Sequence, residues 1–204
     1  MAILVTTAYC PSVSYMTEVI RADEIAIENF ETYSKQTIRN HCNILGPNGR
    51  QTLSIPVIKP NGNHSMTKDV LISPHQPWQM IHWRSIETAY NNSPFFLYYQ
   101  DYFTPFYHKK FKFLLDLNFQ ILQTLLQILK IGPQIRFTEK FEKLPVGITD
   151  LRPATGSKIT AQHFNYPHYT QVFESRHGFI PELSIIDVIF NLGPESCSYL
   201  QSIK

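Results

Sequence analysis

The chain has 204 residues and a formal net charge of +2. Apolar residues make up 43% of it and aromatic residues 13%, which excludes a disordered chain and provides for a sizeable core. Its densest basic cluster, Lys109, Lys110 and Lys112, is too small to indicate a nucleic-acid partner. We therefore expect one domain spanning residues 1–204 that acts on a small-molecule substrate, and the sequence does not define its oligomeric state.

The three cysteines, Cys10, Cys42 and Cys197, are odd in number and far apart, which is typical of a reducing compartment. The first residues lack the basic region and the long apolar run of a signal peptide. The leucine-rich stretch Phe111–Ile131 carries its apolar residues on one stripe, which predicts a buried amphipathic helix. We expect a cytoplasmic protein without a membrane span.

The N-terminal stretch predicts a strand that leads directly into a helix. Ile3–Thr7 is a continuous β-favouring run, and Pro11 and Ser12 open a helix that continues to Ile20. The loop between them would lie at the carboxyl edge of the sheet, where ligands bind in open α/β folds. The first amides of the helix could hold an anion there, but the loop contains no glycine.

A second predicted strand, Glu24–Glu28, leads into the densest group of hydrogen-bonding side chains in the chain. Within the segment Glu28–Asn40 these are Glu28, Glu31, Tyr33, Lys35, Gln36, Arg39 and Asn40. Lys35 and Arg39 could bind a carboxylate or phosphate, Arg39 through two parallel hydrogen bonds. The alternative is a solvated loop with ordinary surface ion pairs.

A β-hairpin is predicted next, because two β-type runs, His41–Leu45 and Gln51–Val57, flank the turn sequence Pro47–Arg50 with its Asn-Gly pair. Pro56 cannot donate a backbone hydrogen bond, so it places the second strand at an edge or ends it. Val70–Ile72 predicts a further short strand.

Trp78–Phe96 begins with a predicted helix, whose inward face would consist of Trp78, Ile81, His82, Ser85, Ile86 and Ala89. His82 is the strongly polar member of this face, and its imidazole titrates near neutrality. It could therefore be a general base at the mouth of a cleft. In that case we expect His82 and Arg39 to flank one pocket, reached by Tyr9 or Tyr15. The alternative is a core histidine with satisfied hydrogen bonds.

The rest of the chain offers weaker signals. The aromatic belt Phe95–Tyr107 could stack on sugars or bases, but we interpret it as core and cleft wall. Gln134–Thr138 predicts a strand. Glu139–His163 has little periodicity and several prolines and glycines, and we interpret it as a mobile flap.

A last helix is predicted to begin at Ser184 as N-cap, with Asp187 as its capping-box partner and a stop at Gly193-Pro194. Capping would account for both polar side chains, so neither is assigned a catalytic role. No phosphate-binding, dinucleotide-binding, zinc-protease or nucleophile-elbow motif is present. The eight histidines show no metal-ligand spacing, so no metal site is predicted, and the cofactor is unknown.

Four ordered segments carry a resemblance to a known family. They are Thr7–Tyr15, Glu28–Asn40 with Lys35-Gln36 and Arg39-Asn40, Trp78–Phe96 with His82-Trp83-Arg84, and Gln171–Gly193 with Leu183–Asp187. Together they span essentially the whole chain, which resembles the WbqC-like proteins in the shorter form common in Bacteroidetes. The resemblance implies a connection with surface-polysaccharide (O-antigen) gene clusters and a cytoplasmic enzyme, a transferase that modifies sugars or attaches an acyl or aminoacyl group.

This chain departs from the family at two places. Many members open with a Gln-Pro-x-Tyr-x-Pro-Trp type of loop, where this chain has Ala8–Ser12. Many carry an aspartate pair after the second strand, where this chain has Glu28 and Asn29. If these positions contact the substrate, the substrate of this protein differs from theirs.

The expected fold is α/β: a single domain with a mixed β-sheet, a β-hairpin and flanking helices. The expected function is a transferase-like enzyme acting on a nucleotide-activated or otherwise polar sugar-related metabolite, with His82 as the catalytic base. Its substrate-binding side chains would be Tyr9, Tyr15, Glu28, Lys35, Arg39 and Asn40. The alternative is a non-catalytic binding or scaffold protein of a biosynthetic complex. A third hypothesis, an adenylate-forming type of nucleotide-binding fold, rests only on the strand–loop–helix start.

Overall fold

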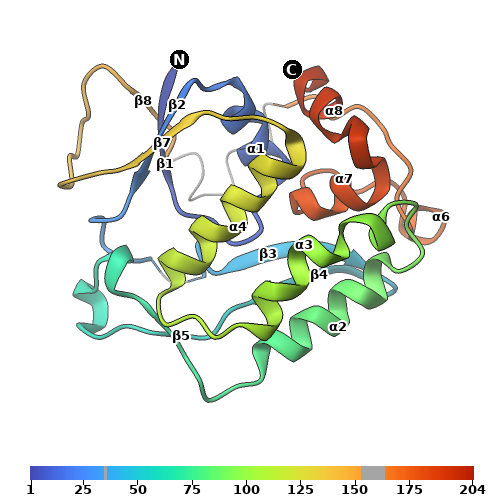
Figure 1. Cartoon of the computed structure of the whole chain (residues 1–204), viewed down its shortest axis with the longest axis horizontal. Helices are drawn as coiled ribbons and strands as arrows, with labels where there is room; N and C mark the ends of the chain where they lie inside the picture. The colour runs from blue at the N-terminus through green and yellow to red at the C-terminus, as the bar shows by residue number, and fades with distance from the viewer. Residues whose placement is uncertain (35, 153–163) are drawn as a thin grey trace.

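The computed structural model describes residues 1–34, 36–152 and 164–204. Its central element is a four-stranded sheet in the order β7-β2-β1-β8 (Figure 1). The strands are β1 (Ala2–Thr6), β2 (Glu24–Glu28), β7 (Gln134–Phe137) and β8 (Thr149–Asp150). All pairings are parallel, so the four carboxyl ends lie at one edge of the sheet.

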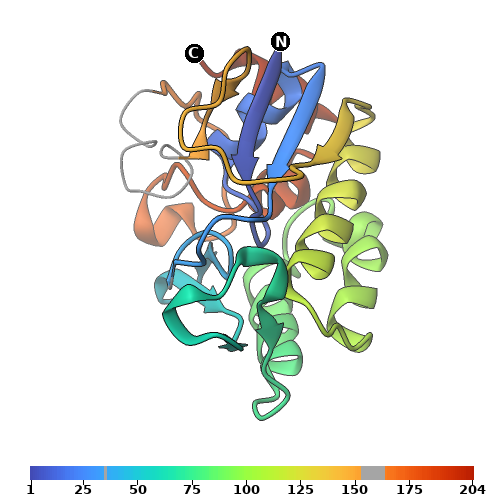
Figure 2. The same cartoon turned by 90° about the vertical axis from the view of Figure 1, so that its left-hand side faces the viewer.

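The two faces of the sheet are covered differently. Ile3 and Val5 of β1, with Ile25 and Ile27 of β2, belong to the main hydrophobic core. Helices α1 (Val13–Arg21) and α4 (Leu114–Leu129) lie on this face. Leu4 and Ala26 alternate with those residues and therefore lie on the opposite face. That face is crossed by the loop between β7 and β8, as Figure 2 shows.

The carboxyl edge of the sheet faces the other half of the molecule (Figure 2). There β3 (His41–Gly46) and β4 (Gly49–Ser54) form an antiparallel hairpin in which Gly46 pairs with Gly49. Gly49 has a φ of 98°, a conformation that side chains with a Cβ rarely adopt. A second antiparallel pair joins β5 (Val57–Ile58) to β6 (Leu71–Ile72), with the short 3₁₀ helices η1 (Gly62–His64) and η2 (Thr67–Asp69) between them.

The remaining helices whose bounds lie in the described residues pack around these strands. They are α2 (Trp78–Tyr90), α3 (Phe96–His108), α6 (Glu174–His177), α7 (Ile185–Leu192), η4 (Gly193–Glu195) and α8 (Ser196–Ser202). α7 ends at Gly193, where a Cβ atom would lie 2.5 Å from the Phe95 ring. Within residues 1–34, 36–152 and 164–204, no helix is long and apolar enough to cross a membrane.

The predicted α/β fold class is confirmed, with the first strand inside the sheet and the hairpin apart from it. The helical stripe of α2 was predicted with one error, because Ile81 is 51% exposed while Trp78, His82 and Ile86 are buried. The aromatic belt is helix α3, which was not predicted as a helix. The interval Glu139–His163 contains strand β8, also not predicted, and the part of the proposed flap at 153–163 lies outside the described residues.

The predicted capping at the start of α7 is wrong, although Ser184 does occupy the N-cap position. The Ser184 side chain makes no capping hydrogen bond and donates to the Cys10 carbonyl at 2.8 Å. Asp187 is buried and accepts hydrogen bonds from Tyr169 Oη at 2.5 Å and Gln171 Nε2 at 3.0 Å. Burial raises the pKa of Asp187, and these hydrogen bonds offset part of the rise. Both side chains that were expected to cap the helix therefore bond to residues of other segments.

Two substitutions of Ser184 distinguish helix capping from the hydrogen bond to the Cys10 carbonyl. Ser184→Ala should lower the free energy of unfolding by about 1–2 kcal/mol, because the buried Cys10 carbonyl loses its donor. Ser184→Asp should destabilise the protein more than Ser184→Ala. Aspartate caps helices as well as serine does, but its carboxylate cannot donate to a carbonyl. Urea unfolding of both variants measures the difference, and an Asp variant as stable as wild type would restore the capping interpretation.

Candidate functional site at the carboxyl edge of the sheet

The order of the strands identifies a candidate ligand-binding position at the carboxyl edge of the sheet. The chain proceeds from β1 to β2 and then to β7 on one side, and it returns to place β8 on the other side of β1. The direction of winding therefore changes between β1 and β8. In open α/β sheets, ligands bind in the crevice at such a switch point.

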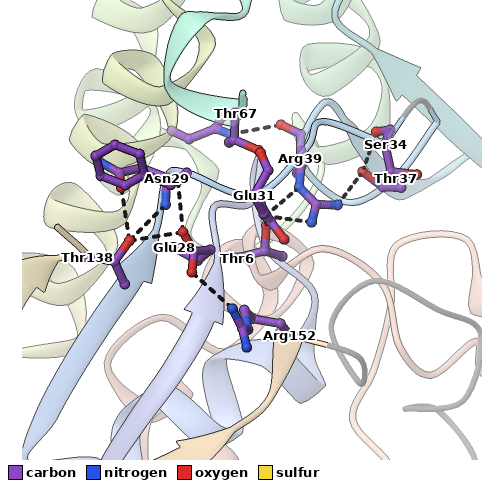
Figure 3. Close-up of polar contacts among 12 residues, drawn as sticks. Thr6, Glu28, Asn29, Glu31, Ser34, Thr37, Arg39, Thr67, Thr138 and Arg152 are labelled. Carbon is purple, nitrogen blue, oxygen red and sulfur yellow. Dashed lines mark hydrogen bonds and ion pairs between the residues drawn. The ribbon is translucent and has the colours of Figure 1, made fainter. Parts of the chain in front are cut away.

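Glu28, the last residue of β2, is fully buried at this edge (Figure 3). Its Oε2 accepts a hydrogen bond from Arg152 Nη1 at 2.9 Å. Its Oε1 accepts from the Phe30 amide at 2.8 Å and from Thr138 Oγ1 at 3.0 Å. The carboxylate is therefore held by three segments, which follow strands β2, β7 and β8.

Arg152 joins β8 to β2. Its Nε and Nη2 donate to the two carboxylate oxygens of Asp150 at 2.9 and 2.7 Å, in addition to the bond with Glu28. Nη2 also donates to the Glu142 carbonyl, in the loop between β7 and β8. Burial alone would raise the pKa of Asp150, but the hydrogen bonds and charge of Arg152 outweigh it and lower the pKa. Asp150 is therefore a carboxylate at neutral pH.

A second ion pair, between Glu31 and Arg39, lies beside the first (Figure 3). Arg39 donates to Glu31 Oε1 through Nε at 2.9 Å and Nη2 at 2.6 Å, and the Thr6 hydroxyl donates to the same oxygen. Arg39 Nη1 donates to Thr37 Oγ1 at 3.1 Å. Glu31 Oε2 accepts no hydrogen bond from the described residues, and the Glu31 side chain is 12% exposed. One oxygen of this carboxylate is thus still available.

We call these residues the edge cluster: Thr6, Glu28, Glu31, Arg39, Thr138, Asp150 and Arg152. It holds three carboxylates and two guanidinium groups, and most of these side chains are buried. Charges removed from water cost several kcal/mol each before pairing, and a hydrophobic replacement is often as stable. Buried charged clusters in this position therefore indicate function more than stability.

A cleft of about 440 Å³ leads from the edge cluster along the outer face of the sheet. Leu4, Ala26 and Glu28 form its floor, and residues of the loop between β7 and β8 border it. We call it the sheet-face cleft. Its volume lies in the range of small-molecule sites in proteins.

Two of the sequence-predicted site residues lie at this edge, and one is outside the described residues. Glu28 and Arg39 belong to the edge cluster. Asn40 donates through Nδ2 to the Ile55 carbonyl at 3.0 Å and borders a different cleft. Lys35 lies outside the described residues.

His82 is only 3% exposed and has a partner on two sides of its ring. The Tyr9 hydroxyl lies 2.9 Å from Nδ1, and the ring also donates to the Ser54 carbonyl. Burial lowers the pKa of His82 to about 4, although the Ser54 carbonyl opposes the shift. His82 lines neither the sheet-face cleft nor the cleft that Asn40 borders. These surroundings favour the core alternative for His82.

The two tyrosines predicted to line the pocket are also buried. Tyr9 contacts His82 and lies 3.0 Å, oxygen to oxygen, from the Tyr107 hydroxyl. The Tyr15 hydroxyl donates to the Thr6 carbonyl at 3.0 Å. Tyr15 thus holds the end of β1 through its hydroxyl. The void that it borders measures only about 10 Å³.

The predicted anion position at the start of α1 is filled by the protein itself. The Ser14 amide donates to Glu182 Oε2 at 3.0 Å, and the Ser14 hydroxyl donates to Oε1 of the same carboxylate. The Tyr166 hydroxyl also donates to Glu182, at 2.6 Å. An internal carboxylate here removes the main support for the adenylate-forming hypothesis.

Thr6, Thr138, Asp150 and Arg152 are members of the edge cluster that the sequence interpretation missed. Their positions in the sequence could have identified them, because each of them ends a strand or follows one within two residues. In the part of the chain that the structure describes, no three His, Cys, Asp or Glu side chains form a group that could hold a metal ion.

The structure thus defines an α/β protein whose buried polar residues converge at the carboxyl edge of a parallel sheet. The chain belongs to the WbqC-like protein family, whose model matches residues 7–152 and 153–199. It is similar to the uncharacterized protein Rv1507c of Mycobacterium tuberculosis, with 25% identity over 224 residues, covering 97% of this chain and 96% of that one. No solved structure matches it.

Proposed function

We propose that this protein is a cytoplasmic, transferase-like enzyme that acts at the edge cluster on a nucleotide-activated or otherwise polar sugar-related metabolite. The observation that supports this is the convergence of two arginine–carboxylate pairs at the β1/β8 switch point. The three cysteines, all free thiols, agree with a reducing compartment.

In this proposal Glu31 accepts the proton of the attacking group, in place of His82. Its Oε2 is unpaired among the described residues, while Arg39 and Thr6 fix the orientation of the carboxylate through Oε1. A base must be within hydrogen-bond reach of the proton that it accepts. His82 would first have to break its bonds to Tyr9 and Ser54.

Arg39 and the sheet-face cleft would bind the rest of the substrate. Arg39 has five N–H donors and uses three nitrogen contacts within the protein, so donors remain for a phosphate or carboxylate. The cleft continues from Glu28 and gives an extended metabolite a place to lie.

A thermal-shift screen tests this proposal. We expect a nucleotide sugar at 100 times its Kd to stabilise the wild type by about 2.7 kcal/mol, and Glu31→Gln to lose most of this shift. Glu18→Gln is the matched control, because Glu18 pairs with Arg21 on α1 and does not line the sheet-face cleft, so it should keep the shift. An equal shift in Glu31→Gln would remove the edge cluster as the site.

A scaffold protein remains the second candidate because α3 exposes Leu97 (69%), Tyr98 (75%) and Tyr102 (42%). Exposed apolar side chains close together are typical of protein contacts. If nucleotide sugars, free nucleotides and amino acids all leave the melting temperature unchanged, this candidate replaces the enzyme.

A further inference from the structure

A cleft of about 500 Å³ lies between the β3–β4 hairpin and helix α2. Residues 46–51, around the turn of the hairpin, form one wall, and Arg84, Ser85 and Thr88 of α2 form the other. We call it the hairpin cleft. It shares no lining residue with the sheet-face cleft, so it is a separate place on the molecule.

The arginines of this protein that lack a carboxylate partner gather at the hairpin cleft. The chain has seven arginines, and four of them pair with carboxylates: Arg21, Arg39, Arg136 and Arg152. The other three, Arg50, Arg84 and Arg176, form no ion pair with any described residue. Arg50 and Arg84 line the cleft, and among the described residues no aspartate or glutamate lines it. Its charged lining residues are therefore all of one sign.

The two walls of the cleft are joined by a hydrogen bond. Gln51 Nε2, on β4, donates to Ser85 Oγ, on α2, at 3.0 Å. Arg50 and Arg84 directly precede these two residues in the chain, and consecutive Cα atoms are only about 3.8 Å apart. Arginine side chains are longer than this distance, so both guanidinium groups can reach one ligand in the cleft.

The turn of the hairpin is held from outside the cleft. The Pro47 carbonyl accepts hydrogen bonds from Arg176 Nη1 and His177 Nε2, each at 3.0 Å. Arg50 Nη2 donates to the Pro181 carbonyl at 3.1 Å. A carbonyl is neutral, so Arg50 keeps its full charge and has N–H donors left on Nε and Nη1.

Arg84 is the more available of the two lining arginines. It is exposed, and its guanidinium makes no hydrogen bond with any described residue. All five of its N–H donors can therefore bind a ligand. Guanidinium groups bind phosphate oxygens through two parallel hydrogen bonds, which makes arginine the preferred residue for phosphate recognition.

We infer that the hairpin cleft binds the phosphate or diphosphate group of a small phosphorylated metabolite, held between Arg50 and Arg84. Among the described residues no aromatic side chain lines the cleft, so a nucleobase would find no ring to stack on there. The ligand is therefore a phosphorylated compound whose phosphate carries the recognition. This inference goes beyond the proposed function, because it needs neither the edge cluster nor a transfer reaction.

An NMR titration with inorganic pyrophosphate at constant ionic strength can test the inference. The backbone amides of Gly49 and Thr88 report on the site, because both residues line the cleft, so pyrophosphate bound at Arg39 would not imitate the signal. We expect saturable shifts with a Kd on the order of 1 mM or lower. Arg84→Gln should raise this Kd at least about tenfold, because hydrogen bonds to a charged group are lost. It should melt like wild type, because the Arg84 side chain has no partner among the described residues.

Lys110→Gln is the matched control, since it removes one positive charge from an exposed residue that does not line the cleft. It should keep the wild-type Kd. The inference is overturned if Gly49 and Thr88 do not shift, if Arg84→Gln binds like wild type, or if Lys110→Gln weakens binding equally, because net charge alone would then explain it. Succinate binding as tightly as pyrophosphate would contradict the assignment to phosphate. Glu31→Gln should leave these shifts unchanged, so a failure of the proposed function would not imitate a failure here.

Discussion

Replacing Arg152 by methionine should lower the free energy of unfolding by about 3–5 kcal/mol. The reason is the burial of its partner, since the Glu28 side chain is 1% exposed and would lose the guanidinium that pairs with it. Asp150 would lose two hydrogen bonds at the same time. Urea unfolding monitored by circular dichroism measures the change.

Arg136→Met is the matched control. Arg136 also pairs with a glutamate of β2, Glu24, but the two side chains are 56% and 36% exposed. Exposed pairs contribute about 0–1 kcal/mol, so this variant should unfold almost like wild type. If both variants lose the same stability, the edge cluster is an ordinary ion-pair network and the argument from its burial is wrong.

A double variant refines the result. Glu28→Gln combined with Arg152→Met removes the buried charge together with its partner, so it should be more stable than Arg152→Met alone. Such non-additivity is expected for groups in direct contact. It would show that the cost of the single variant is mainly the unpaired Glu28 carboxylate.

The elements predicted correctly from the sequence are those whose signal is local. β1 was visible as an apolar run and β2 as an alternation of polar and apolar residues. The hairpin was visible through its Asn-Gly pair, and α2 and α4 through their helical periodicity. Strand β8 is two residues long and pairs with Ile3 and Leu4, nearly 150 positions away in the chain. No short window contains the information that selects such a strand.

The edge cluster shows the same difference between local signals and contacts that are distant in the sequence. The polar segment Glu28–Asn40 was recognised from its composition alone, and it contributes Glu28, Glu31 and Arg39 to the edge cluster. Arg152 could not be assigned, because its role depends on β8 lying beside β1. His82 was singled out because it is polar on an apolar helix face. The sequence could not show that Tyr9 and the Ser54 carbonyl already satisfy its ring.

The buried His82 should make the stability of the protein depend on pH. Its pKa is about 4 when folded and near the ordinary 6.5 when unfolded, so the unfolded chain binds more protons between these values. The stabilisation is therefore complete above pH 6.5 and is lost as the pH falls towards 4. From the shift we expect a total of on the order of 3 kcal/mol, of which about 2 kcal/mol is lost between pH 7.5 and pH 5.

His82→Gln isolates this contribution, because glutamine can still donate and accept hydrogen bonds but does not titrate. Whatever its stability at pH 7.5, this variant should lose about 2 kcal/mol less than wild type on going to pH 5. The control is His64→Gln, which replaces an exposed histidine of η1 and should follow the wild-type profile. If wild type and His82→Gln have parallel profiles, then His82 is accessible to water and protons. In that case the general-base role excluded from our proposal would again compete with Glu31.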